Sequence, residues 1–171
     1  IGVADTNNLF GALEFSEKAA GKGIQPIVGC ELAVDFGGEG EGNERFQHGK
    51  GAVVLIAATD RGFSNLSELV SRAWLEGSGG KTAVHMDWIE QMSDGLICLT
   101  GGPEGAIDPL LAAGLDGLAE ERLLRLARLF EDRLYVEIQR HEKAAEQAVE
   151  PRLIDLAYRH DIALVAPNEP Y

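Results

Sequence analysis

Four groups of polar residues follow or lie within apolar, strand-like stretches of this 171-residue sequence. They are Asp5-Thr6-Asn7, Glu31, Gln139-Arg140-His141 and Asn168-Glu169-Pro170-Tyr171. Carboxylates and a histidine that meet at one edge of a sheet are suitable ligands for Zn²⁺, Mn²⁺ or iron in hydrolytic sites. Their spacing matches no local ligand motif, and polar residues in such places also cap helices or face solvent. The spacing therefore leaves two interpretations open. These residues form a metal site, or they are polar residues that cap helices or face solvent.

The candidate ligands are Glu31, His141 and Glu169, which we expect to lie near one another. Glu31 is equally suited to pairing with an arginine or a turn N–H, and His141 to facing solvent. We assign no catalytic role to the other three histidines, which are His48, His85 and His160.

Six apolar stretches predict the strands that position these residues. Because they alternate with helical patterns, we expect mostly parallel pairing through right-handed crossovers, in an α/β barrel or a doubly wound sheet. No glycine-rich nucleotide-binding loop follows any strand, which favours the barrel. The predicted strands are Ile1–Ala4, Pro26–Phe36, Ala52–Ala57, Gly95–Thr100, Leu134–Gln139 and Ala163–Ala166.

Helical periodicity and helix-ending residues define the segments between these strands. Asn8 is expected to cap the first helix, with Leu9 and Phe10 packed behind it. Residues 37–51 are rich in glycine and lack an apolar period, so we expect a flexible loop. Further helices are expected at about 60–74, 87–92, 107–113, 118–130 and 142–160, the last broken at Pro151.

The composition limits the classes of function. Acidic residues outnumber basic ones 28 to 15, giving a net charge of −13, and the basic residues are interleaved with acidic ones. We therefore expect that this domain does not bind nucleic acid by itself. Cys30 and Cys98 lie in apolar runs, as buried, reduced thiols of a cytoplasmic protein do. The length suits one domain, 1–171, with no signal peptide or membrane span, and its opening inside a strand predicts that it is a fragment of a longer chain.

Several long strings occur in the order found in one family. "NNLFGALEFSEKAAGKGIQPIVGCEL", "GFSNLSELVSRAWLEG", "GLICLTGGPEGAI" and "YVEIQRH" resemble the PHP (polymerase and histidinol phosphatase) domains of bacterial DNA polymerase III α subunits. The resemblance covers nearly the whole chain. It implies a distorted seven-stranded (βα) barrel, similar to a TIM barrel and lacking here its first strand, which carries a His-x-His pair in the family.

The resemblance also implies a degenerate metal site. The family's Thr-Asp-His-Gly turn is Ala4-Asp5-Thr6-Asn7 here, so Thr6 occupies a ligand position. Ala52 and Tyr171 stand at two further histidine positions, whereas Gly29-Cys30-Glu31 and Gln139-Arg140-His141 are kept. Glu31, His141 and Glu169 would then be a vestigial ligand set, because Thr6, Ala52 and Tyr171 are lost ligand positions.

Three functions follow from the resemblance. The first is a non-catalytic PHP domain that supports a replicative DNA polymerase and docks its proofreading exonuclease subunit. This domain needs no cofactor. Nucleotidyl transfer with Mg²⁺ and the contact with DNA belong to the rest of the parent polymerase. The second is an active Zn²⁺- or Mn²⁺-dependent phosphoesterase, a 3′–5′ exonuclease or pyrophosphatase. The third is a stand-alone small-molecule phosphatase, which the polymerase-like strings disfavour.

Overall fold

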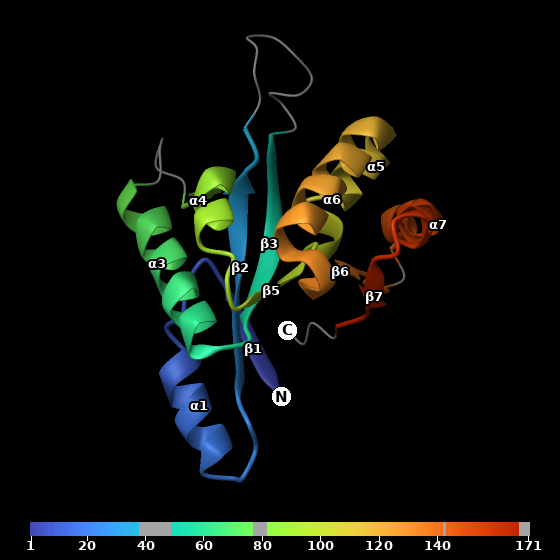
Figure 1. The fold of residues 1–171 in the computed structure, drawn as a ribbon. Coiled ribbons are helices and arrows are strands. Elements are labelled where there is room, and N and C mark those ends of the chain that lie inside the picture. Colours follow the sequence, from blue (N-terminus) through green and yellow to red (C-terminus); the bar gives the residue numbers. More distant parts are fainter. Residues whose placement is uncertain (38–48, 77–81, 142, 168–171) are drawn as a thin grey trace.

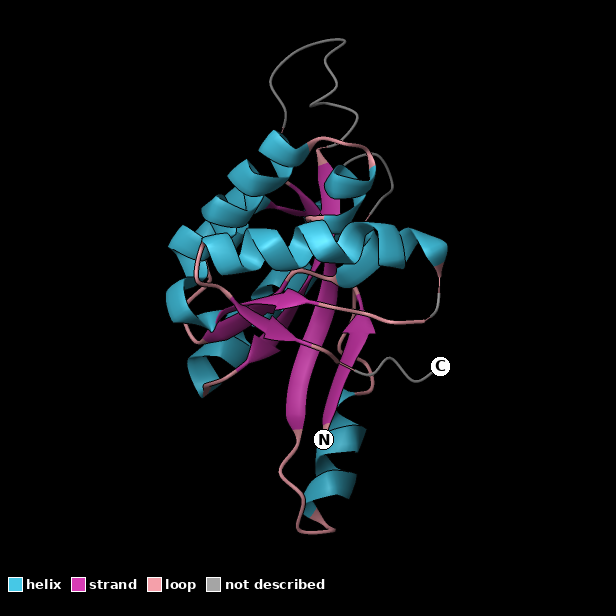
Figure 2. Ribbon diagram, turned by 90° about the vertical axis from the view of Figure 1, so that its right-hand side faces the viewer, coloured by secondary structure: helices cyan, strands magenta, loops and turns pink. Residues whose placement is uncertain are grey.

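The computed structural model describes residues 1–37, 49–76, 82–141 and 143–167. Within these residues the fold is mixed α/β, with one twisted sheet of seven strands flanked by helices (Figures 1 and 2). The strands are β1 (Gly2–Thr6), β2 (Ile27–Asp35), β3 (Lys50–Ala57), β4 (Val84–His85), β5 (Leu96–Leu99), β6 (Leu134–Glu137) and β7 (Ala163–Val165). The α-helices are α1 (Ala12–Ala20), α3 (Asp60–Glu76), α4 (Met86–Gln91), α5 (Asp108–Ala112), α6 (Asp116–Phe130) and α7 (Ala144–Arg159), and the short 3-10 helices are η2 (Gly102–Glu104) and η3 (Glu131–Arg133).

The sheet is mixed, with strand order β1-β2-β3-β5-β6-β7 and β4 beside β2. The expected parallel pairing is found for β1–β2, β2–β4, β5–β6 and β6–β7. It is wrong for β3, which is antiparallel to both β2 and β5. An apolar run has the same pattern in either direction, so its composition does not predict strand polarity. The described pairings include none between β1 and β7, and barrel closure stays a prediction.

Side chains alternate between two faces of the sheet. One face carries Cys30, Leu32, Val53 and Leu55, which are fully buried. They belong to one hydrophobic core with side chains of α3, α4, α5, α6 and α7. We call the opposite side the inner face; it carries the alternate residues, such as Glu31 and Val54.

The predicted helices and strands are found, but several of them begin or end at other residues than expected. Lys50 and Gly51 belong to β3 rather than to the predicted loop, and the loop's residues 38–48 lie outside the described residues. The predicted break at Pro151 is wrong, because α7 is continuous through it. None of the described helices is long and apolar enough to span a membrane.

The first helix begins later than expected. Asn8 is not its cap: Asn8 Oδ1 accepts a hydrogen bond from Phe10 N at 3.0 Å, and α1 starts only at Ala12. The expected packing of Phe10 is also wrong, since its side chain is 85% exposed. The turn satisfies its own backbone locally, and the helix is displaced from it.

Helix α3 is fixed to the start of β5 by a close backbone approach. Thr59 Oγ1 accepts a hydrogen bond from Gly62 N at 3.0 Å and so caps the helix. Asn65 Nδ2 donates to Asp94 O at 2.8 Å. A Cβ atom on Gly62 would lie 1.9 Å from Gly95 O, so this helix turn has no room for a side chain.

We therefore expect Gly62→Ala to lower the free energy of unfolding by about 3 kcal/mol, because backbone must move to admit the methyl group. Gly117→Ala is the matched control, since nothing lies within 4 Å of a Cβ atom there. In α6 that change should be neutral or stabilising by up to about 1 kcal/mol. Urea unfolding of the two variants measures the difference, and equal midpoints would contradict the packing described.

Candidate functional site

The turn after β1 is built around Asn7. Its φ of 56° is in the left-handed region, which asparagine tolerates better than most residues. Asn7 N donates to Glu31 O at 2.7 Å, and Asn7 Oδ1 accepts from Ala33 N at 3.1 Å. Trp74 Nε1 donates to Asn7 O at 2.8 Å. Asn7 thus ties the turn both to β2 and to α3.

Cys30 lies directly beneath this turn. Its Sγ donates to Asp5 O at 3.1 Å and to Asn8 O at 3.3 Å, and burial raises the pKa of the thiol to about 12. Cys98 is also a free, buried thiol whose pKa is raised by burial. Both cysteines therefore stay protonated at neutral pH, and the prediction of buried, reduced thiols is confirmed.

Three of the predicted positions share the inner face of the sheet. Thr6 pairs with Glu31 in the β1–β2 register, and Glu31 pairs with Val54 in the β2–β3 register. Ala52 is two residues from Val54 and so points to the same side. Thr6 is exposed, Glu31 is half-buried and Ala52 is buried. The end of β1, the middle of β2 and the start of β3 thus bring these three positions to one side of the sheet.

Glu137 is a further inner-face residue that the sequence reasoning missed. Val54 pairs with Leu99, and Leu99 pairs with Tyr135, so Tyr135 is on the inner face. Glu137 is two residues beyond Tyr135 and therefore points to the same side. It is 2% exposed, and its Oε1 accepts a hydrogen bond from Gln139 Nε2 at 2.6 Å. Its alternation with Tyr135 in "LYVE" was the signal that could have found it.

Asp108 adds a second carboxyl near Glu137. Its Oδ1 is buried and has no hydrogen-bond partner among the described residues. Burial, and after it the charge of Glu137, raises the pKa of Asp108 to about 7. Two carboxyl groups so placed do not readily ionise together, so Asp108 carries a proton for much of the neutral range.

His141 is bound to the beginning of α7. Its Nδ1 lies 3.1 Å from Glu146 Oε1, and its backbone N–H donates to Glu146 Oε2 at 2.7 Å. The hydrogen bond from the His141 backbone, and after it the contact with the imidazole, lower the pKa of Glu146. Glu146 therefore fixes the imidazole through Nδ1, as carboxylates do for ligating histidines, and directs Nε2 elsewhere.

These residues do not form a complete metal centre in the described part of the chain, where no three His, Cys, Asp or Glu side chains are placed to share an ion. Glu169 and Tyr171 lie outside the described residues. The expected meeting of Glu31, His141 and Glu169 accordingly stays a prediction. Among the described residues, Asp108 can hold a proton and the imidazole of His141 is oriented by Glu146.

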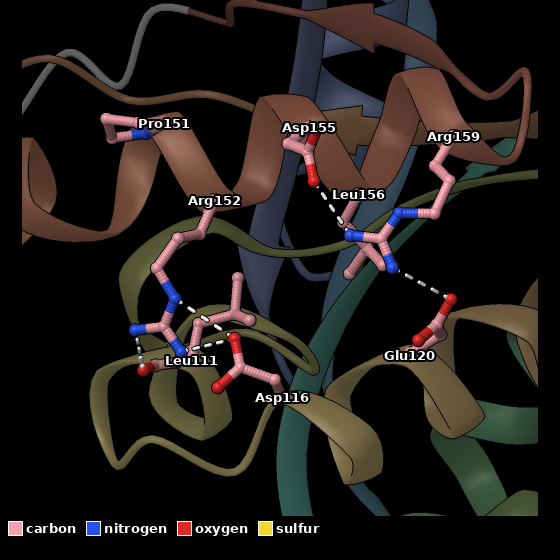
Figure 3. A pocket seen from close by; sticks show the side chains of 8 residues that line it. All are labelled: Leu111, Asp116, Glu120, Pro151, Arg152, Asp155, Leu156 and Arg159. Carbon is pink, nitrogen blue, oxygen red and sulfur yellow. Dashed lines mark hydrogen bonds and ion pairs between the residues drawn. The ribbon is translucent and has the colours of Figure 1, made fainter.

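A hollow of about 260 Å³ lies elsewhere, among α5, α6 and α7 (Figure 3). Arg152 binds Asp116 through two nitrogens and donates from Nη1 to Leu111 O at 2.7 Å. Arg159 contacts Glu120 and Asp155. This network of ion pairs joins the helices and accounts for the charges of the hollow.

Comparison with known proteins matches residues 1–141 to the PHP domain model. The chain belongs to the PHP domain family. It is 44% identical over 172 residues to the DNA polymerase III subunit alpha of Caulobacter vibrioides, 34% over 175 residues to that of Treponema pallidum, and 33% over 177 residues to that of Thermus aquaticus. Each match covers 99% of this chain.

The PHP chain spans only 14–15% of the length of these three relatives. The polymerase name therefore describes proteins several times longer than this chain. What the match shows for this chain is its PHP family and its correspondence to one region of DNA polymerase III α subunits.

The raised pKa of the Asp108 carboxyl predicts a pH dependence of stability in this PHP domain. A carboxyl whose folded pKa is raised contributes stability below its unfolded pKa, and that contribution is lost as the pH rises through about 7. Between about pH 5 and pH 7 the loss from this group should be about 2 kcal/mol, and above the folded pKa it should level off. Asp108→Asn, which stays neutral, should remove this part of the slope.

Urea unfolding at several pH values checks this expectation, with Asp132→Asn as the control because Asp132 is exposed in η3. The control should keep the slope of the original protein. An unchanged slope in Asp108→Asn would show that the Asp108 carboxyl does not titrate in this range.

Proposed function

We propose that this chain is the PHP domain of a replicative DNA polymerase III α subunit and that it is non-catalytic. In this proposal residues 1–171 form one domain, a distorted barrel of the PHP type. The domain supports the architecture of the polymerase and docks the proofreading exonuclease subunit. Nucleotidyl transfer with Mg²⁺ and the contact with DNA belong to other domains of the parent chain, which acts in the bacterial cytoplasm.

The observation that carries the proposal is the chemistry of Thr6 and Ala52. Both share the inner face with Glu31, but a methyl group binds no metal and a neutral threonine hydroxyl is a weak ligand. The adjacent turn is held by Asn7 through protein hydrogen bonds and does not depend on a metal for its shape. These features suit a scaffold better than a hydrolytic centre.

A specific feature supports the alternative, an active phosphoesterase that uses Zn²⁺ or Mn²⁺. His141 is oriented by Glu146 through Nδ1, the arrangement that prepares an imidazole for metal binding through Nε2. Glu31 and Glu169 would be its carboxylate companions. A bound metal would supply an activated water for hydrolysis.

Phosphoester hydrolysis by the full-length protein separates the two functions. A chromogenic phosphodiester and a 3′-labelled single-stranded oligonucleotide are incubated with Mn²⁺ or Zn²⁺, with His141→Ala as the matched variant. The proposal expects no turnover that depends on His141. Hydrolysis that is lost on His141→Ala would establish the phosphoesterase instead.

Histidines introduced at positions 6 and 52 should strengthen metal binding without producing hydrolytic activity. Thr6→His together with Ala52→His adds two neutral nitrogen donors on the face of Glu31, and we expect Zn²⁺ affinity to rise about tenfold or more. Binding should strengthen with pH as the histidines lose their protons. Efficient hydrolysis should stay absent, because Tyr171 still stands where the family has a histidine.

Calorimetric titration with Zn²⁺ and Mn²⁺ measures this effect. Ala20→His with Ala145→His is the control, since both residues are exposed on helices. Equal affinities of the two double variants would mean that Thr6 and Ala52 do not converge, and the assignment of lost ligand positions would fail.

A further inference from the structure

Two carboxyl groups lie near each other where α5 begins and β6 ends. Asp108 is the first residue of α5, and Glu137 is the last residue of β6. Glu137 is 2% exposed, and Oδ1 of Asp108 is buried without a hydrogen-bond partner among the described residues. Burial, and after it the charge of Glu137, raises the pKa of Asp108, so the two groups act on each other. Acidic side chains seldom come together away from water unless something offsets their charge.

Glu137 is firmly held in the sheet. Its backbone N–H donates to Thr100 Oγ1 at 3.0 Å, and β6 pairs with β7 at this residue. Its Oε1 accepts a hydrogen bond from Gln139 Nε2 at 2.6 Å. The amide of Gln139 is confined in turn, since a Cβ atom on Gly102 would lie 2.7 Å from it. Glu137 therefore has little freedom to change its position.

Asp108 stands on a less constrained element. Its side chain is half-buried, and α5 has only five residues, Asp108–Ala112. A helix of this length makes few hydrogen bonds of its own and depends on its packing. Asp108 is therefore the member of the pair that can move toward water.

The charges that act on Asp108 within the described part of the chain are acidic. Glu146 of α7 adds a smaller effect of the same sign as that of Glu137. Glu104 of η2, the element before α5, is exposed and also acidic. Cys98 of β5, whose thiol feels the charge of Glu137, stays protonated because burial raises its pKa. None of these groups offsets a negative charge at Asp108.

Two arginines of the neighbouring helices are engaged by other groups. Arg122 of α6 donates to Ala106 O at 3.0 Å, just before α5. Arg152 of α7 pairs with Asp116. A proton on the carboxyl group is thus the means by which Asp108 avoids a second negative charge beside Glu137.

We propose that Asp108 and Glu137 hold one proton between them and that loss of this proton displaces the start of α5 from the end of β6. Two ionised carboxylates repel each other strongly where water is largely excluded. Because Glu137 is fixed in the sheet, Asp108 moves toward water and takes the first turn of α5 with it. The junction between α5 and β6 therefore opens as the pH rises through about 7.

This junction adjoins the inner face of the sheet. Gly105, in the loop before α5, forms a bridge to Ala52, and the segment after β6 leads to His141. A displacement of α5 consequently reaches both sides of the candidate site. The inference does not depend on whether the domain is catalytic.

Methyl NMR of the full-length protein, labelled at isoleucine, tests the proposal. Ile107 precedes Asp108 and Ile138 follows Glu137, so each methyl signal reports on one carboxyl group. The two signals, assigned through isoleucine-to-valine variants, should shift in one step with the same midpoint, about pH 7. Ile24 follows α1, which Figure 1 draws far from α5, and its signal should not shift.

Three variants identify the titrating group. Asp108→Asn cannot ionise and should abolish the step at both isoleucines. Glu137→Gln removes the neighbouring charge and should lower the midpoint by about one pH unit. His141→Ala is the control, because a histidine titrates in the same range, and it should leave the step in place.

A soluble gadolinium chelate, which broadens methyl signals near water, tests the displacement itself. Ile107 is fully buried, and its signal should broaden more above the midpoint than below it, whereas that of Ile138 should change little. Equal broadening of the Ile107 signal on both sides of the midpoint would overturn the displacement.

The shared proton is overturned by any of three results. These are different midpoints at Ile107 and Ile138, a step that persists in Asp108→Asn, and a step that is lost in His141→Ala. Where Asp108→Asn does not fold, the titration of the unaltered protein and the midpoint of Glu137→Gln still decide the question.

Discussion

The pairing of β2 is the constraint on which the rest of the structure depends. β2 is parallel to β1 and β4 and antiparallel to β3, so one strand sets the register of three others. A shift by a single residue would turn Cys30 and Leu32 out of the core and Glu31 into it. Burying an unpaired carboxylate there would be costly, and the same alternation that forms the core therefore fixes the inner face.

Much of this arrangement could be predicted from the sequence, because buried strands read as apolar runs and helices as apolar periods. The direction of β3 could not, since a run such as "AVVLIA" is the same pattern in both directions. The hydrogen bond from Phe36 N to Gly49 O, next to the pair Asp35 and Lys50, is what makes the connection a hairpin. The two-residue strand β4 was missed because it is too short to show a period.

The site was predictable in part, for a similar reason. Sequence position placed Glu31 within a strand and His141 after one, but did not predict the partner that each would take. His141 binds Glu146, which is five residues away on the next helix, and Glu137 lies within a strand rather than after it. Asp108 comes near Glu137 only through tertiary packing. Pairwise contacts of this kind depend on where helices dock, which local patterns do not encode.

The Asn7 turn has a consequence for how this region can change over time. Its left-handed backbone and its bonds to Ala33 N, Glu31 O and the Trp74 indole are all made by residue 7, and none uses the side chain of Thr6. Position 6 is therefore structurally independent of the turn that presents it. A different side chain can therefore be introduced at position 6 by one substitution while the surrounding geometry persists, so the chemistry of this position can change without a change of fold.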